Sequence, residues 1–189
     1  MWSFGLLQVG IGDPSRGLCG GMAFVARDRF ERGASGVEDP APPSPGSALF
    51  DEVVGRQFAS FGRLFSVPLR FWIAAALMSE RRRVRETVRD AWPAIRAEID
   101  GGAPAMVGLV REASWNPLTP GLGHQVVAYR YDAAPDLVTI GIYDPNHPGD
   151  DEVEIRIART NDGWFELGQS TGEPLLGLLH LPFAPVPTR

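Results

Sequence analysis

The sequence contains no lysine, so its 18 basic residues are all arginine. This absence excludes mechanisms that depend on a lysine side chain, such as Schiff-base chemistry or a phosphate-binding P-loop. The formal net charge of −5 argues against a broadly basic nucleic-acid surface. One arginine-rich run, over 80–89, has acid–base pairs at helical spacing, and we interpret it as a solvated helix face. We therefore expect no nucleic-acid partner.

Cysteine occurs once, as Cys19. A lone cysteine excludes an internal disulfide and any zinc site that needs several thiolates. Two interpretations of Cys19 remain. It is either a small buried hydrophobic side chain or a reactive thiol.

Long hydrophobic runs are also missing. The longest apolar stretch, around 71–78, is far shorter than the roughly 20 residues that a membrane-spanning helix needs. The first residues carry no basic region ahead of an apolar stretch and no cleavage site typical of a signal peptide. We expect no membrane span, and a protein that is cytoplasmic by default or secreted by a signal-independent route.

The chain changes character near its middle, which predicts an α+β fold. We expect one domain over 1–189, with a helical lobe over about 1–102 and an antiparallel sheet lobe over about 103–189. The predicted helices cover 19–32, 47–61 and 68–99, with Pro93 dividing the last one. The predicted strands cover 105–110, 125–131, 137–143, 152–157 and 175–181, joined by short loops typical of a meander.

Cys19 lies at the predicted start of the first helix. A helix N-terminus offers unpaired backbone N–H groups and a partial positive charge, which favour thiolate over thiol. We expect the glycines beside Cys19 to allow close approach of a substrate, because they lack a side chain. The pattern of Met22, Val25, Ala26 and Phe30 predicts the apolar face of this helix.

His124 and Asp144 are the candidate partners of that thiol. His124 opens a predicted strand, where an imidazole can face a cleft and act as a general base. Asp144 ends the next strand, and an antiparallel pairing of the two strands would bring its carboxylate to His124. Asn146 is a second candidate for this orienting role. The alternatives are a surface histidine and an ordinary Asp-Pro turn that caps local N–H groups.

The other two histidines and the possible metal sites are weaker candidates. His147 lies in a polar turn that looks solvent-facing, and His180 lies in an apolar run where it would pack. The segment from Asp144 onward resembles the start of an EF-hand loop, but position five is Pro148 and position twelve is Ile155. The histidines and the cysteine also lack zinc-ligand spacing. We expect no metal and no cofactor.

Three segments together resemble the papain-like cysteine peptidase superfamily, especially its bacterial toxin-type and bacteriocin-processing branches. They are GLCGGMAF around Cys19, GHQVVAYRY around His124, and IYDPN around Asp144. The resemblance covers about a sixth of the chain, although the order of the three segments spans most of it. It implies a helical lobe bearing Cys19, a sheet lobe bearing His124 and Asp144, and an active cleft between the lobes.

The resemblance also implies a function, a Cys-His-Asp cysteine hydrolase acting on a peptide or protein substrate. The expected substrates are peptide or isopeptide bonds. Deamidation or transamidation of amide side chains stays open, because the same catalytic groups serve those reactions. Many members carry a glutamine about six residues before the cysteine, but this chain has Asp13 there, and Gln8 is the nearest amide that could assist the oxyanion. The alternative is a catalytically inactive papain-like domain that serves as a binding module.

Overall fold

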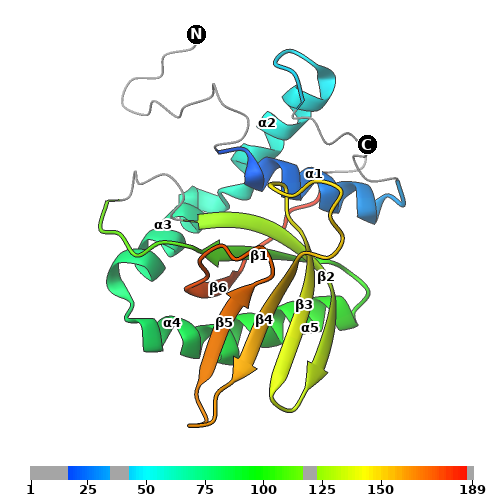
Figure 1. Cartoon of the computed structure of the whole chain (residues 1–189). Helices are drawn as coiled ribbons and strands as arrows, with labels where there is room; N and C mark the ends of the chain where they lie inside the picture. Colours follow the sequence, from blue (N-terminus) through cyan, green and yellow to red (C-terminus); the bar gives the residue numbers. More distant parts are fainter. Residues whose placement is uncertain (1–16, 35–42, 117–122, 187–189) are drawn as a thin grey trace.

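The computed structural model describes residues 17–34, 43–116 and 123–186, which form helices and one antiparallel sheet (Figure 1). The α+β class expected from the sequence is therefore confirmed. No helix in the described ranges is long and apolar enough to cross a membrane. The helical elements come first along the chain: α1 (Cys19–Glu31), α2 (Ala48–Ser60), η1 (Arg63–Phe65), α3 (Ser66–Trp72), η2 (Ile73–Leu77), α4 (Glu80–Glu86), η3 (Thr87–Ala91) and α5 (Trp92–Asp100).

The strands follow the helices and pair in the order β5-β4-β3-β2-β1-β6. Each neighbouring pair is antiparallel, and β2 to β5 form the predicted meander. The last strand returns to pair with β1 on the other side. The strands are β1 (Ala105–Val110), β2 (Gly123–Ala134), β3 (Leu137–Tyr143), β4 (Glu154–Arg159), β5 (Phe165–Gln169) and β6 (Gly177–His180).

Side-chain pattern explains why these segments become strands. All six residues of the apolar strand β1 are buried, because β1 lies between β2 and β6 and is covered on both faces. In β4, buried Ile155 and Ile157 alternate with more exposed residues, as in a strand with one face in a core. The sequence did not predict β5, a short strand with a glycine in its interior.

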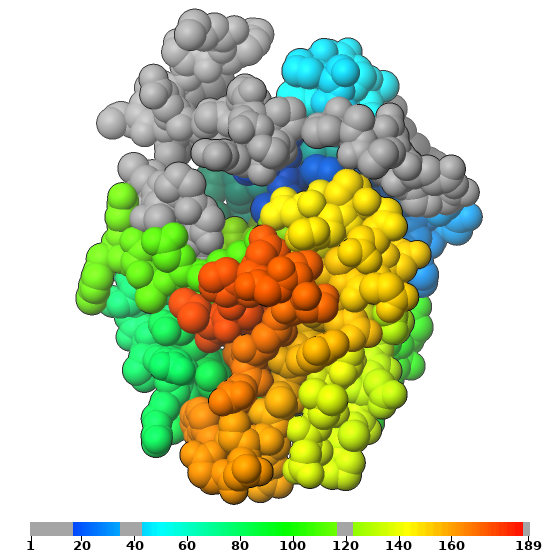
Figure 2. Space-filling view, viewed as in Figure 1, coloured from blue at the N-terminus to red at the C-terminus, as the bar shows by residue number. Residues whose placement is uncertain are grey.

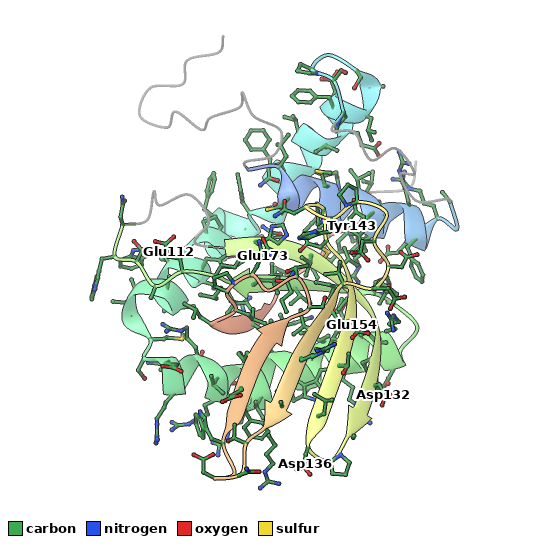
Figure 3. All side chains as sticks on the ribbon, in the orientation of Figure 1. Glu112, Asp132, Asp136, Tyr143, Glu154 and Glu173 are labelled. Atoms are coloured by element: carbon green, nitrogen blue, oxygen red, sulfur yellow. The ribbon has the colours of Figure 1, made fainter. Side chains whose placement is uncertain are left out.

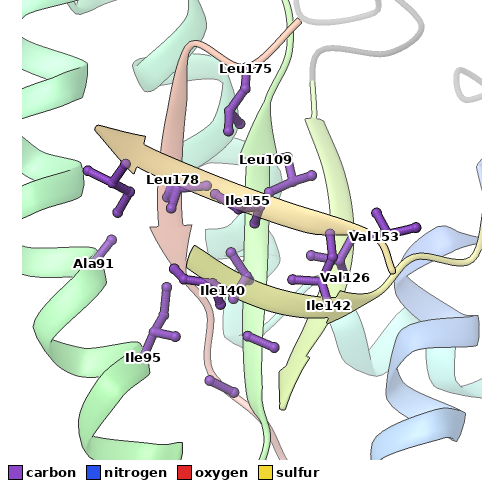
Figure 4. Close-up of a cluster of buried hydrophobic side chains, with 14 residues drawn as sticks. Ala91, Ile95, Leu109, Val126, Ile140, Ile142, Val153, Ile155, Leu175 and Leu178 are labelled. Carbon is purple, nitrogen blue, oxygen red and sulfur yellow. The ribbon is translucent and has the colours of Figure 1, made fainter. Parts of the chain in front are cut away.

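Two hydrophobic cores lie on the two faces of the sheet. The first contains Leu109, Val126, Ile140 and Ile155 and packs against Ile95 of α5 (Figure 4). The second has β1, β2 and β6 on one side and α1, α3 and η2 on the other. Its members include Phe24, Phe71, Ala75, Met106, Val110, Val127 and Leu181. The helices of the first half therefore pack on both faces of the sheet.

The long helical region over 68–99 breaks at a different place from the one predicted. Met78 has an extended backbone, and Ser79 then caps α4 by accepting a hydrogen bond from the Arg82 N–H. Pro93 instead lies in the first turn of α5, directly after the π-helical turn η3. In a first turn the missing N–H of proline costs no hydrogen bond, so the helix continues.

Candidate active site

Cys19 is the first residue of α1, and its side chain is half-buried. The preceding residue, Leu18, forms no side-chain cap, so the N–H groups of the first turn must find other acceptors. The Gly20 N–H faces the Cys19 sulfur, and the Gly21 N–H donates to Oε1 of Gln57 in α2 at 2.6 Å. The sulfur therefore lies at the positive end of a helix, as the sequence predicted.

The two glycines that follow Cys19 face α2. A Cβ placed on Gly20 would lie 2.3 Å from the Ser60 Oγ, and one on Gly21 would lie 2.2 Å from the Val53 carbonyl oxygen. Both glycines thus permit close packing of α1 against α2, rather than the close approach of a substrate that we expected. This packing fixes the helix that carries Cys19.

His124 is the second residue of β2 and is almost completely buried. Its imidazole is hydrogen-bonded to the Cys19 side chain, and its Nε2 lies 2.5 Å from Oδ1 of Asp144. Because Nε2 is taken by the carboxylate, Nδ1 is the nitrogen left for the sulfur. The ring therefore bridges a thiol and a carboxylate.

Asp144 follows β3 directly and is fully buried. The pairing of Val127 with Tyr143 aligns the end of β3 with the start of β2, which brings Asp144 to His124. The Asn146 backbone N–H also donates to Oδ1 of Asp144, at 2.9 Å. The carboxylate thus caps its own Asp-Pro turn and contacts the imidazole, so both sequence interpretations of Asp144 describe real contacts.

A second group of polar side chains supports the far oxygen of Asp144. Oδ2 accepts hydrogen bonds from Nε2 of Gln169 at 3.1 Å and from an Arg111 guanidinium nitrogen at 3.3 Å. Arg111 also holds both carboxylate oxygens of Glu173, at 2.8 and 2.9 Å. The carboxylate of Asp144 is therefore held from both sides, by imidazole and by guanidinium.

These supporting groups come from late in the chain. The connection after β5 (orange) lies on the surface beside the β3–β4 connection (yellow) in Figure 2. His147 of the β3–β4 connection has its Nε2 3.3 Å from the Glu173 carboxylate. Glu173 and Tyr143 lie at the end of the sheet nearest α1, and Asp136 lies at the opposite end (Figure 3). The polar network thus gathers at the end of the sheet where α1 begins.

The contacts shift the ionisation of all three central groups. Burial opposes ionisation of Cys19, but contact with His124 and the N–H groups of Gln125 and Gly20 outweigh it and lower the pKa of the thiol. Burial alone would lower the pKa of His124, yet hydrogen bonds to Asp144 and Cys19 raise that pKa to about 9. Thiolate and imidazolium therefore form together.

Asp144 stays ionised despite its burial. Burial raises the pKa of its carboxyl group, but His124, the Asn146 N–H and the Arg111 charge together lower it below the ordinary value. A carboxylate here fixes the orientation of the imidazole and stabilises its protonated form. Chemically, the arrangement can deliver a thiolate nucleophile with a proton donor beside it.

One group of side chains has the composition of a metal site. Asp144, His147 and Glu173 place one ligand atom each within 4.8 Å of one another. The Arg111 guanidinium already bonds to both carboxylates, and His124 takes the other oxygen of Asp144. A cation there would compete with a fixed positive charge, so these residues do not fit a metal ion.

The remaining predicted residues have varied positions. Gln8 and Asp13 lie outside the described residues. The side chain of Asn146 is exposed, and this residue reaches Asp144 through its backbone N–H. His180 is half-buried and pairs with Glu98 at 2.8 Å, rather than packing among apolar side chains.

Sequence reasoning missed Arg111, Gln169 and Glu173. A signal existed for Arg111, a charged residue directly after a wholly apolar strand, where a buried charge needs a partner. Gln169 ends the strand that was not predicted, and Glu173 follows in a turn, so neither had a local signal. The comparisons with protein-family models, with curated proteins and with solved structures found no match to this chain.

Proposed function

We propose that this chain is a cysteine hydrolase of papain-like arrangement that cleaves amide bonds in peptides or proteins. One observation carries the proposal: the His124 imidazole bridges the Cys19 thiol at a helix N-terminus and the buried Asp144 carboxylate. The chain order, with the thiol on an early helix and the other two groups on a later antiparallel sheet, supports the papain-like arrangement.

The first half-reaction forms an acyl-enzyme. The Cys19 thiolate attacks the carbonyl carbon, and the carbonyl π electrons move to oxygen. The His124 imidazolium then gives its proton to the leaving nitrogen as the C–N bond breaks, which leaves a thioester on Cys19 and releases an amine. The negative oxygen needs donors near the sulfur, and we assign part of this role to the backbone N–H of Cys19, the first residue of α1.

The second half-reaction restores the enzyme. Neutral His124 takes a proton from water as the water oxygen attacks the thioester carbon. The C–S bond breaks, the product leaves as a carboxylic acid, and the thiolate–imidazolium pair forms again. Asp144 stays ionised throughout and keeps Nε2 of His124 in place.

The proposal is tested by the pH dependence of iodoacetamide alkylation at Cys19, together with hydrolysis of a fluorogenic peptide pool. We expect alkylation to be fast well below pH 7, because the pKa of Cys19 is lowered. Cys19→Ala should abolish both labelling and hydrolysis. Alkylation that rises only near the ordinary thiol pKa, with no hydrolysis, would instead favour the inactive binding module.

A further inference from the structure

An exposed cluster of large apolar side chains lies where α2 ends and α3 begins. We call it the apolar rim, and it consists of Phe58, Phe61, Leu64, Phe65 and Leu69. Leu64 at its tip is 98 % exposed, and Phe58, Phe65 and Leu69 are each more than half exposed. Phe61 contacts Phe58 edge-on and stacks on Phe65. Contiguous apolar surface of this kind marks a binding site in soluble proteins.

The backbone of the rim is strained at its tip. Leu64 has φ 54° and ψ 35°, and Phe65 has φ 56° and ψ 32°. Bulky residues rarely adopt this left-handed conformation, and two in succession are rarer still. The strained turn holds the Leu64 side chain almost wholly in solvent and leaves more than half of Phe65 exposed. Strain of this kind collects at functional sites.

Both ends of the rim are anchored to the candidate active site. Ser60, just before Phe61, packs its Oγ against Gly20, the residue after Cys19. At the other end, the Phe71 ring packs against Gly123, the residue before His124. The residues that adjoin the two ends of the rim therefore pack against the chain neighbours of the thiol and the imidazole.

The charged side chains in the chain segment that forms the rim are all positive. Arg63 lies in the strained turn with an exposed side chain. No acidic residue occurs between Glu52 and Glu80, although the whole chain has a net charge of −5. An occupant with an acidic side chain beside its apolar ones would therefore be favoured over a basic one.

We propose that the apolar rim docks an extended peptide segment of the substrate through large apolar side chains that neighbour an acidic residue. This inference rests on the proposed function, because the rim borders the site of the acyl transfer. It gives the proposed hydrolase a substrate class, namely proteins that expose an apolar and acidic segment next to the scissile bond. Docking there orders the segment before the thiolate attacks. Burial of the Leu64 and Phe65 side chains offsets the free-energy cost of that ordering.

The test measures peptide binding by the full chain with Cys19→Ala, so binding is read independently of catalysis. A phage-displayed library of random decapeptides is panned on this protein, and selected peptides are synthesised with a fluorescein label. We expect enrichment of Leu, Ile, Phe or Met beside Asp or Glu. Adding Leu64→Gly should weaken binding about tenfold or more in fluorescence anisotropy, because one buried apolar contact is lost.

Leu64→Gly separates docking from folding. Glycine accepts the left-handed backbone, and an almost fully exposed side chain leaves no cavity, so the melting temperature should stay equal or rise. Leu137→Gly, at an exposed leucine of the β2–β3 hairpin, is the matched control and should change binding less than twofold. Arg63→Gln should reduce the preference for acidic peptides without removing the preference for apolar ones.

Three outcomes would overturn the inference. One is that panning enriches no apolar–acidic peptide, or that Leu64→Gly binds the selected peptides as the parent does. Another is that the protein sediments with phosphatidylcholine–phosphatidylglycerol vesicles, that Leu64→Gly abolishes this sedimentation, and that Leu64→Gly leaves peptide binding unchanged. That result would make the rim a membrane contact. The third is a dimer that Leu64→Gly dissociates. Failure of the proposed hydrolase is distinguishable, because peptide binding would persist while alkylation and hydrolysis tests fail.

Discussion

The imidazole–carboxylate pairs of His124 and His180 share their chemistry but differ in their surroundings. Nε2 of His124 lies 2.5 Å from Asp144, and Nε2 of His180 lies 2.8 Å from Glu98. The side chains of the first pair are 6 % and 0 % exposed, and those of the second are 29 % and 28 % exposed. Only the first pair has a thiol at the other ring nitrogen. The second pair is therefore an internal control for the first.

The comparison shows that a short imidazole–carboxylate contact occurs in this fold both with and without burial and a neighbouring thiol. The His124 pair is buried, and opposite charges interact strongly in a buried environment. Arg111 and Gln169 donate further hydrogen bonds to the Asp144 carboxylate. The carboxylate of the His180 pair, Glu98, also pairs with Arg27 at 2.8 Å, and solvent screens these charges. Burial, the neighbouring thiol and the surrounding donors distinguish the two pairs.

The largest expected effect comes from removing the imidazoles. His124→Asn should lower kcat/KM for a fluorogenic peptide about a thousandfold, because the proton donor and the thiolate partner are both lost. His180→Asn should leave kcat/KM within twofold. Equal losses from the two substitutions would mean that the pairs act through fold stability rather than chemistry, and thermal unfolding of both variants would show it.

The next effect comes from neutralising the carboxylates. Asp144→Asn keeps the shape of the site but removes the charge that stabilises imidazolium, so kcat should fall about a hundredfold or more. Arg111 would keep its pairing with Glu173 but lose its charged contact with residue 144, costing about 2 kcal/mol of unfolding free energy in urea denaturation. Glu98→Gln should change kcat by less than twofold. An unchanged kcat in Asp144→Asn would contradict the proposed mechanism.

A smaller effect is expected from Arg111, which acts on the chemistry only through Asp144. Arg111→Met should lower kcat about tenfold and leave KM unchanged, because the carboxylate loses a positioning partner. The acidic limb of the kcat profile should also move to higher pH, since Arg111 lowers the pKa of Asp144. Arg96→Met, which removes an exposed pair with Asp100, is the control. A uniform loss of activity with no shift of the acidic limb would indicate a structural role alone.

The smallest expected change is a shift of the basic limb of that profile. Acylation needs His124 protonated, so where acylation limits the rate kcat should rise with pH as Asp144 and Cys19 ionise and fall as pH passes about 9. Asp144 raises the pKa of His124, so Asp144→Asn should move the basic limb to lower pH. Glu98→Gln should leave it in place. A basic limb that responds equally to both substitutions would contradict the distinction between the two pairs.

The sequence predicted those parts of the fold that local patterns determine. Glycine, proline and apolar runs predicted where α1 and β2 begin and where β3 ends. The pairing of β2 with β3 then brings His124 and Asp144 together. The strand β5 was missed, because it is only five residues long and has a glycine in its interior.

Long-range packing explains most of the remaining misses. The predicted apolar face of α1 included Phe30, which is exposed, whereas Arg27 and Asp28 on the same helix are buried. Ion pairs with Glu98 and with Arg56 make that burial possible, and neither partner lies in α1. The positions of Arg111 and Gln169 around Asp144 depend in the same way on strands distant in sequence.

The order in which the chain contributes to the site has a consequence for synthesis on the ribosome. The thiol emerges early, whereas the groups that activate it and their supports, up to Gln169 and Glu173, emerge more than a hundred residues later. A nascent chain therefore displays only an ordinary cysteine for most of its elongation. The full set of contacts around His124 and Asp144 forms only after Gln169 and Glu173 have been synthesised, so under the proposed function hydrolysis begins late in synthesis.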